Sequence, residues 1–208
     1  YMVMRYERGR TLQQQIQMRQ DQMSERLVRH VFMHLLNGLR EVHTHKLLHL
    51  DIKPANIYLR TDGSPVLLDF GAARQTLTTQ RPKLAPMYTP GFAAPEQYRE
   101  PDRLGPWTDV YGIGASMFAC LAAFAPQAAD ARESGRRALI ETGVWAGQYS
   151  DNVLEVIDWC LRLDPLERPL DLREQKLLAV AEPEGQRLGV LGARLVHVVG
   201  KVVGVEDR

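Results

Sequence analysis

Apolar residues between positions 24 and 45 recur three and four residues apart, which is the spacing of one face of an α-helix. The apolar positions are Leu27, Val28, Val31, Phe32, Leu35, Leu36, Leu39 and Val42. Ser24 stands just before this pattern and predicts the N-cap of a long amphipathic helix. A more uniformly apolar run from Trp107 to Leu121 predicts a buried helix, and a third helix is predicted over residues 153 to 163.

Short β-strands are predicted between the first two helices. Residues 57–59 and 66–68 are apolar, and the polar residues 60–64 join them, so the segment predicts a β-hairpin. Residues 1–12 begin with an alternating apolar pattern that runs into a turn containing Gly9, which predicts a further strand at the start of the chain. The chain is therefore expected to combine a larger number of helical residues with a few short strands.

Composition adds few constraints. The 208 residues are 45% hydrophobic and carry a formal net charge of +1, which fits one hydrophobic core and gives no indication of a nucleic-acid partner. The two cysteines, Cys120 and Cys160, lie far apart in apolar surroundings, as expected of buried thiols in a reducing cytosol. No signal peptide or membrane-spanning run is apparent, so a cytoplasmic location is predicted.

Four chemically useful side chains are concentrated in one short region. Residues 49–56 read His-Leu-Asp-Ile-Lys-Pro-Ala-Asn, and Asp-Phe-Gly follows at positions 69–71. Phosphoryl transfer requires a base for the incoming hydroxyl, a cation near the phosphate and ligands for magnesium. Asp51 is the candidate base and Lys53 the candidate cation. Asn56 and Asp69 offer the oxygen ligands that magnesium prefers.

Plainer structural roles also fit these residues one by one. Asp51 could be a helix N-cap, and Asp69 could be a turn residue. Their combination with Lys53 and Asn56 favours a site, because solvated surface poorly explains two carboxylates, an ammonium and an amide together. The predicted hairpin also places one magnesium-ligand candidate just before its first strand and the other just after its second.

The order of the motifs resembles a known family. The protein kinase signature contains H-R-D-L-x-x-x-N, D-F-G and A-P-E in this order, and Ala94-Pro95-Glu96 supplies the third motif here. The chain is identified as a member of the eukaryotic-type serine/threonine protein kinases, with spellings typical of the bacterial, or Hanks-type, branch. The resemblance covers about residues 1–180 and implies an α+β fold, the mainly α-helical C-terminal lobe with short β-hairpins around the catalytic loop. Residues 181–208 are expected to form a tail or linker.

The resemblance implies roles for further residues. Thr89, together with Lys53, is typical of serine/threonine rather than tyrosine kinases, and Thr89 is expected beside Asp51. ATP is the implied phosphoryl donor, Mg²⁺ the implied cofactor and a protein with serine or threonine the implied partner. The implied nucleotide contacts are Met4, Tyr6, Glu7, Thr11 and Tyr58. Simple core packing explains Met4 and Tyr58 equally well.

Other residues are implied to support the site. His49, Phe70 and Gly71 belong to the motifs themselves. Asp109 is expected to brace the catalytic loop by accepting backbone N–H bonds, although an ordinary helix N-cap is the rival explanation. Arg168 is expected to form an ion pair with Glu96, the alternative being a solvated arginine between two prolines.

Two departures from the family pattern affect the expected mechanism. Leu50 stands where most members have the arginine that binds a phosphorylated activation loop. The glycine-rich loop and strand lysine that precede the hinge are also absent from these 208 residues. We therefore expect a kinase fragment with hinge and C-terminal lobe, inactive by itself. A pseudokinase or scaffold is the alternative, and a small-molecule phosphotransferase is disfavoured by the A-P-E segment.

Overall fold

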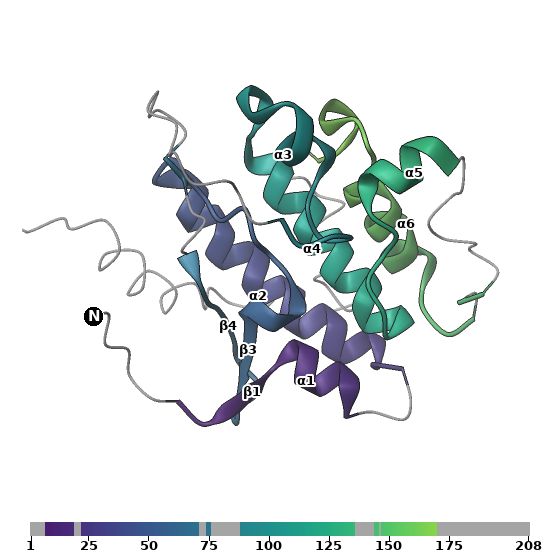
Figure 1. The fold of residues 1–208 in the computed structure, drawn as a ribbon. Coiled ribbons are helices and arrows are strands. Elements are labelled where there is room, and N and C mark those ends of the chain that lie inside the picture. The colour runs from purple at the N-terminus through teal and green to yellow at the C-terminus, as the bar shows by residue number, and fades with distance from the viewer. Residues whose placement is uncertain are drawn as a thin grey trace, which may run out of the picture.

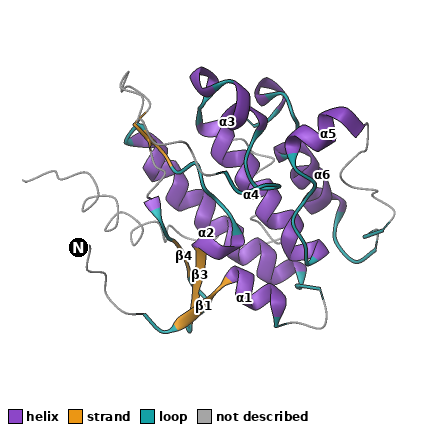
Figure 2. Ribbon diagram, in the orientation of Figure 1, coloured by secondary structure: helices purple, strands orange, loops and turns teal. Residues whose placement is uncertain are grey.

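The structure is a computed structural model, and it describes residues 7–18, 22–70, 74–75, 88–135, 144–145 and 147–169. The helices in this part of the chain are α1 (Leu12–Gln17), α2 (Glu25–Thr44), α3 (Pro95–Arg99), α4 (Pro106–Ala122), α5 (Ala129–Gly135) and α6 (Asp151–Cys160). Helices dominate the regular structure, and strands β1, β3 and β4 gather beside α1 and α2 (Figure 1, Figure 2). The expectation of a mainly helical chain with small sheets is confirmed.

Two small antiparallel sheets flank the segment 49–53. Strand β1 (Gly9–Thr11) pairs with β3 (Ile57–Arg60), and β3 pairs with β4 (Pro65–Leu67). Strand β2 (Leu47–Leu48) pairs with β5 (Arg74–Gln75). The predicted hairpin is confirmed, with Tyr58 opposite Val66. A short 3₁₀ helix, η1 (Pro54–Asn56), then connects the segment to β3.

The long helix α2 follows its sequence pattern closely. Seven of the eight apolar residues expected on its inner face are buried, and Leu27 is only partly buried. Ser24 does occupy the N-cap position, but its side chain makes no capping hydrogen bond. Its backbone oxygen instead accepts from Leu27 N and Val28 N. The expected N-cap is therefore confirmed in position, and its capping contacts come from the backbone.

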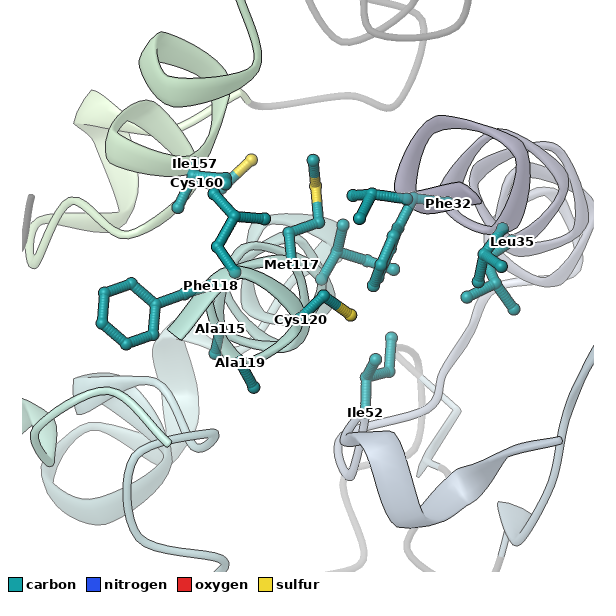
Figure 3. Close-up of a cluster of buried hydrophobic side chains, with 14 of the residues drawn as sticks. Phe32, Leu35, Ile52, Ala115, Met117, Phe118, Ala119, Cys120, Ile157 and Cys160 are labelled. Carbon is teal, nitrogen blue, oxygen red and sulfur yellow. The ribbon is translucent and has the colours of Figure 1, made fainter. Parts of the chain in front are cut away.

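Helix α4 is the centre of the core. Figure 3 shows it between α2 and α6, with Met117 and Cys120 among the side chains that pack around it. The helix begins one residue earlier than predicted, because Gly105 is its N-cap and Pro106 fits the first helical position, where no N–H is needed. Asp109 lies inside the first turn, so the alternative that made it the N-cap is wrong.

Helix α6 differs from its predicted limits at both ends. It begins at Asp151, because the polar residues of its first turn do not belong to the apolar pattern, and Ser150 is the N-cap. It ends at Cys160, three residues before the predicted end. Pro165 follows shortly afterwards and starts the 3₁₀ helix η4 (Pro165–Glu167); proline disfavours helical backbone at the residue before it.

Both cysteines are buried and unpaired with each other. Burial raises the pKa of both thiols, in the case of Cys160 to about 12, so they remain protonated and behave as small apolar side chains. None of the described helices is both long enough and apolar enough to cross a bilayer.

Candidate active site

One buried carboxylate on α4 binds the backbone of the segment 49–53. Asp109 Oδ2 accepts from His49 N at 2.9 Å, and Asp109 Oδ1 accepts from Leu50 N at 2.8 Å. The expectation that Asp109 braces this loop through backbone N–H groups is confirmed. Backbone groups that are tied to a helix in this way cannot swing away without leaving a buried charge unpaired.

A third partner of Asp109 was not expected from the sequence. His43, in the last turn of α2, lies with its Nε2 2.8 Å from Asp109 Oδ2. Burial raises the pKa of Asp109, but the hydrogen bonds and charge of His43 and the contacts of His49 outweigh it and leave the pKa lowered. The carboxylate therefore stays ionised. The only sequence signal for His43 is its position four residues after Leu39, which places it on the apolar face of α2.

Leu50 has an unusual backbone conformation. Its φ is +65°, in the left-handed region that residues other than glycine rarely adopt. Asp69, two residues after β4, has a similar φ of +60°. Such strain persists only where surrounding contacts enforce it. The strained residue Leu50 directly precedes Asp51, the predicted base.

The predicted catalytic residues meet around Asp51. Its Oδ2 lies 2.8 Å from Lys53 Nζ and accepts from Asn56 Nδ2 at 2.8 Å. Its Oδ1 accepts from the Thr89 hydroxyl at 3.2 Å, and Lys53 Nζ donates to Thr89 Oγ1 at 2.8 Å. Residues 38 positions apart are thus joined in one polar cluster. Asp51, Lys53 and Thr89 are only half-buried, so this side of the cluster is accessible from solvent.

Asn56 and Asp69 lie where two strands begin and end. Leu68 N donates to Asn56 O at 2.8 Å, which brings the start of β3 next to the end of β4. Asp69 is exposed, whereas Asn56 is nearly buried. Within the described residues no group of three or more His, Cys, Asp or Glu could hold a metal. One carboxylate and one amide oxygen fit magnesium, which completes its shell with phosphate oxygens and waters.

Part of the predicted nucleotide site lies on the first sheet. Thr11 is paired with Tyr58 across β1 and β3, and the Tyr58 hydroxyl donates to Glu7 O at 2.9 Å. Thr11 is also the N-cap of α1, since its hydroxyl accepts from Gln14 N at 3.1 Å. These three residues are therefore brought together. The predicted residues Met4, Tyr6 and Gly71, and the tail 181–208, lie outside the described residues.

His49 is buried and connects the loop to the second motif. Its Nε2 donates to Leu68 O at 2.9 Å, because a carbonyl can only accept, and its Nδ1 then accepts from Asp51 N at 3.3 Å. The ring packs edge-on against Phe70 with centroids 4.6 Å apart. Burial lowers the pKa of His49 despite the nearby charge of Asp109, so the ring is neutral.

This arrangement predicts a stability that depends on pH. As the pH falls through about 6.5, the unfolded chain binds a proton at position 49 before the folded chain does, so the free energy of unfolding decreases. Replacing His49 by Gln removes this titration. Urea unfolding at about pH 7 and about pH 5.5 should therefore give a smaller stability loss for His49→Gln than for the wild type. Equal losses in both would contradict a neutral His49.

The predicted ion pair between Glu96 and Arg168 is confirmed. Arg168 Nη1 and Nη2 lie 2.7 and 2.9 Å from the two carboxylate oxygens, and both side chains are fully buried. Thr108, another residue missed in the sequence, donates to Glu96 Oε1 at 2.9 Å. The guanidinium also lies over the ring of Tyr111, 5.1 Å from its centroid. The pair fixes α3 against α4 and η4.

The family model described as a protein kinase domain matches residues 1–175. The chain belongs to the protein kinase family. Family membership agrees with the polar cluster around Asp51 and with the bracing of its loop by Asp109. The present kinase chain departs from the family signature at Leu50, whose described hydrogen bonds are made by its backbone.

Named relatives of the kinase chain include two from cyanobacteria. It is 32% identical to serine/threonine-protein kinase PknA of Nostoc sp., over 84% of this chain and 31% of that protein. It is 31% identical to serine/threonine-protein kinase C of Synechocystis sp., over 81% of this chain and 32% of that protein. A solved structure of PpkA-294 in its apo form is similar with a TM-score of 0.68 and 28% identity, over 85% of this chain and 61% of that one. The kinase chain thus spans about a third of the length of the two cyanobacterial relatives.

Proposed function

We propose that this kinase chain forms the hinge and catalytic lobe of a serine/threonine kinase, which transfers the γ-phosphoryl group of ATP to a hydroxyl of a protein. The observation that carries the proposal is the cluster of Asp51, Lys53 and Thr89 beside Asn56. The serine/threonine kinases among its relatives support the class of substrate. The two buried free thiols support a reducing compartment such as the cytosol.

The cluster suggests how each side chain would act. Asp51 Oδ1 already accepts a hydrogen bond from the Thr89 hydroxyl, so the same oxygen is suited to accept the proton of an incoming serine or threonine. Lys53, 2.8 Å from Asp51 Oδ2, would hold the γ-phosphate close to that hydroxyl. Thr89 would keep both side chains in place. Positioning of this kind supplies most of the catalysis in phosphoryl transfer.

Asn56 and Asp69 are the proposed magnesium ligands. Asn56 donates through Nδ2 to both the backbone oxygen and the carboxylate of Asp51, which leaves Oδ1 as the atom for a cation. Bound magnesium would neutralise charge on the phosphates. The decisive experiment is transfer of labelled phosphate from ATP to serine, threonine and tyrosine peptides by the full-length protein. Transfer to tyrosine alone, or to none of the three, would contradict the proposal.

Replacing Asp69 by Asn should weaken binding of magnesium-ATP. The amide retains one oxygen but loses the charge that attracts the cation, so the dissociation constant should rise by at least about 10-fold, the loss that even indirect partners of a metal cause. Titration calorimetry with and without magnesium measures it. Asp62→Asn is the matched control, because Asp62 lies in the hairpin turn, where its carboxylate accepts from Ser64 N. Equal effects of the two variants would exclude a metal role for Asp69.

Leu50 predicts that activity does not depend on phosphorylation of the activation segment. A phosphorylated threonine carries a charge of about −2 and needs a nearby cation, but position 50 offers none. The ordering contacts are instead those of Thr89 with Asp51 and Lys53. Turnover of the full-length protein before and after complete phosphatase treatment should agree within about twofold, which corresponds to about 0.4 kcal/mol. A tenfold loss would mean that another basic residue has taken the role.

A catalytically inactive scaffold is the alternative function. The structure offers it no specific support, because a protein that only binds partners has no need for a base, a cation and a hydroxyl within hydrogen-bond distance of one another. The A-P-E segment, residues 94–96, continues to disfavour a small-molecule phosphotransferase. Glu96 of that segment is engaged in the buried ion pair rather than in a ligand site.

A further inference from the structure

Gln97, the residue after the A-P-E motif, connects two parts of the site. It lies in α3 and is 7% exposed. Its Oε1 accepts from Ala94 N at 2.9 Å, and its Nε2 donates to Leu50 O at 2.8 Å. Since a backbone N–H only donates and a carbonyl only accepts, these two partners determine the orientation of the amide.

The first of these bonds is ordinary helix capping. Gln14 makes the same bond in α1, where its Oε1 accepts from Thr11 N at 2.9 Å on the exposed surface. The second bond goes further, because Leu50 lies 47 residues before Gln97 and belongs to the loop that carries Asp51. Capping of α3 accounts for the bond of Gln97 Oε1 but not for the bond of Nε2 to the loop.

The Leu50 carbonyl belongs to the peptide group that leads into Asp51. The N–H of this same peptide contacts His49 Nδ1 at 3.3 Å, and the N–H of Leu50 is held by Asp109. Leu50 keeps its left-handed φ of +65° between these attachments. Removal of the bond from Gln97 would free the peptide plane from one side, and the strained residue could then relax.

We propose that Gln97 is a positioning residue for Asp51, which orients the Leu50–Asp51 peptide and links the catalytic loop to the segment that carries Thr89. The inference rests on the proposed function for its effect on turnover. Thr89 lies five residues before Ala94, the capping partner of Gln97. The backbone between them is held in a turn, because Phe92 N and Ala93 N donate to Thr89 O. One side chain thus fixes the base and the threonine relative to each other. The link uses no phosphate.

Two variants in the full-length protein separate this role from capping. Gln97→Glu keeps an oxygen for Ala94 N but loses the donor to Leu50 O, whereas Gln97→Met loses both bonds without burying a charge. Both should raise the hydrogen-exchange rate of the backbone amides in residues 47–53 at least tenfold. Both should lower kcat at least tenfold with KM for ATP changed less than twofold. Gln14→Glu is the matched capping control, and exchange in 47–53 should equal that of the wild type.

Failure of the positioning role and failure of the proposed function give different results in these experiments. Exchange in 47–53 within twofold of the wild type for both Gln97 variants would overturn the proposal, as would increased exchange spread evenly over the whole protein. A Gln97→Glu variant that behaves like the wild type would mean that capping is the entire role. If the wild type transfers no phosphate, the proposed function fails, and the exchange data still decide whether Gln97 holds the loop.

Discussion

Replacing Asp51 by Asn should reduce the turnover of the full-length protein by about 10²–10⁴. The amide has nearly the same shape and can still accept from Lys53 or Asn56, so the loop should keep its conformation. It cannot take the proton of the substrate hydroxyl, which is the step that the carboxylate is proposed to assist. Affinity for magnesium-ATP should remain nearly unchanged. Steady-state phosphate transfer and nucleotide titration on the same sample measure both quantities.

Two comparisons make this result specific. Asp62→Asn removes the same charge from the hairpin turn, where Asp62 accepts from Ser64, and turnover should be preserved. Asp69→Asn should show the opposite division of effects, with weakened nucleotide binding. If Asp51→Asn and Asp69→Asn lose nucleotide affinity equally, the assignment of base and metal ligand is wrong.

Replacing Arg168 by Met should destabilise the protein by about 3–5 kcal/mol. The Glu96 carboxylate would remain buried with Thr108 as its only other described hydrogen-bond partner. Arg168 also donates to the backbone oxygens of Arg162 and Leu163, and these carbonyls would lose a donor. Urea unfolding followed by circular dichroism gives the change in the free energy of unfolding.

A surface pair provides the control for this measurement. Arg162 Nη2 lies 3.1 Å from Asp158 on the exposed side of α6, and Arg162→Ala should cost only about 0.3–0.5 kcal/mol. The double variant Glu96→Met/Arg168→Met should be less destabilised than Arg168→Met alone, because no charge is left unpaired. A single variant that unfolds like the surface control would show that the pair contributes little.

The sequence predicted those parts of the site that are local or carried by ordered motifs. Asp51, Lys53 and Asn56 lie within six residues of chain, so their proximity needs little knowledge of the fold. The contacts of Asp109 with the loop and of Glu96 with Arg168 span the fold, and they were predicted only through the family resemblance. Their geometry then depended on packing between helices.

Other features could not be predicted from patterns of single residue types. His43 and Gln97 act through contacts that span 66 and 47 positions, and neither belongs to a motif that indicates a partner. The ends of α4 and α6 were misplaced by one to three residues, because glycine, proline and polar first-turn residues determine helix ends while hydrophobic periodicity describes only the middle. Tertiary proximity and end effects thus account for most of the differences.

The backbone attachment of Leu50 also bears on how regulation can evolve. Both peptide groups of this residue are occupied, the N–H by Asp109 and the carbonyl by Gln97, so its described hydrogen bonds are all made by the backbone. A change of side chain at position 50 therefore removes neither of these two hydrogen bonds. Under the proposed function, one substitution at position 50 would add or remove a cation for an activating phosphate, while these backbone attachments of the loop stay the same.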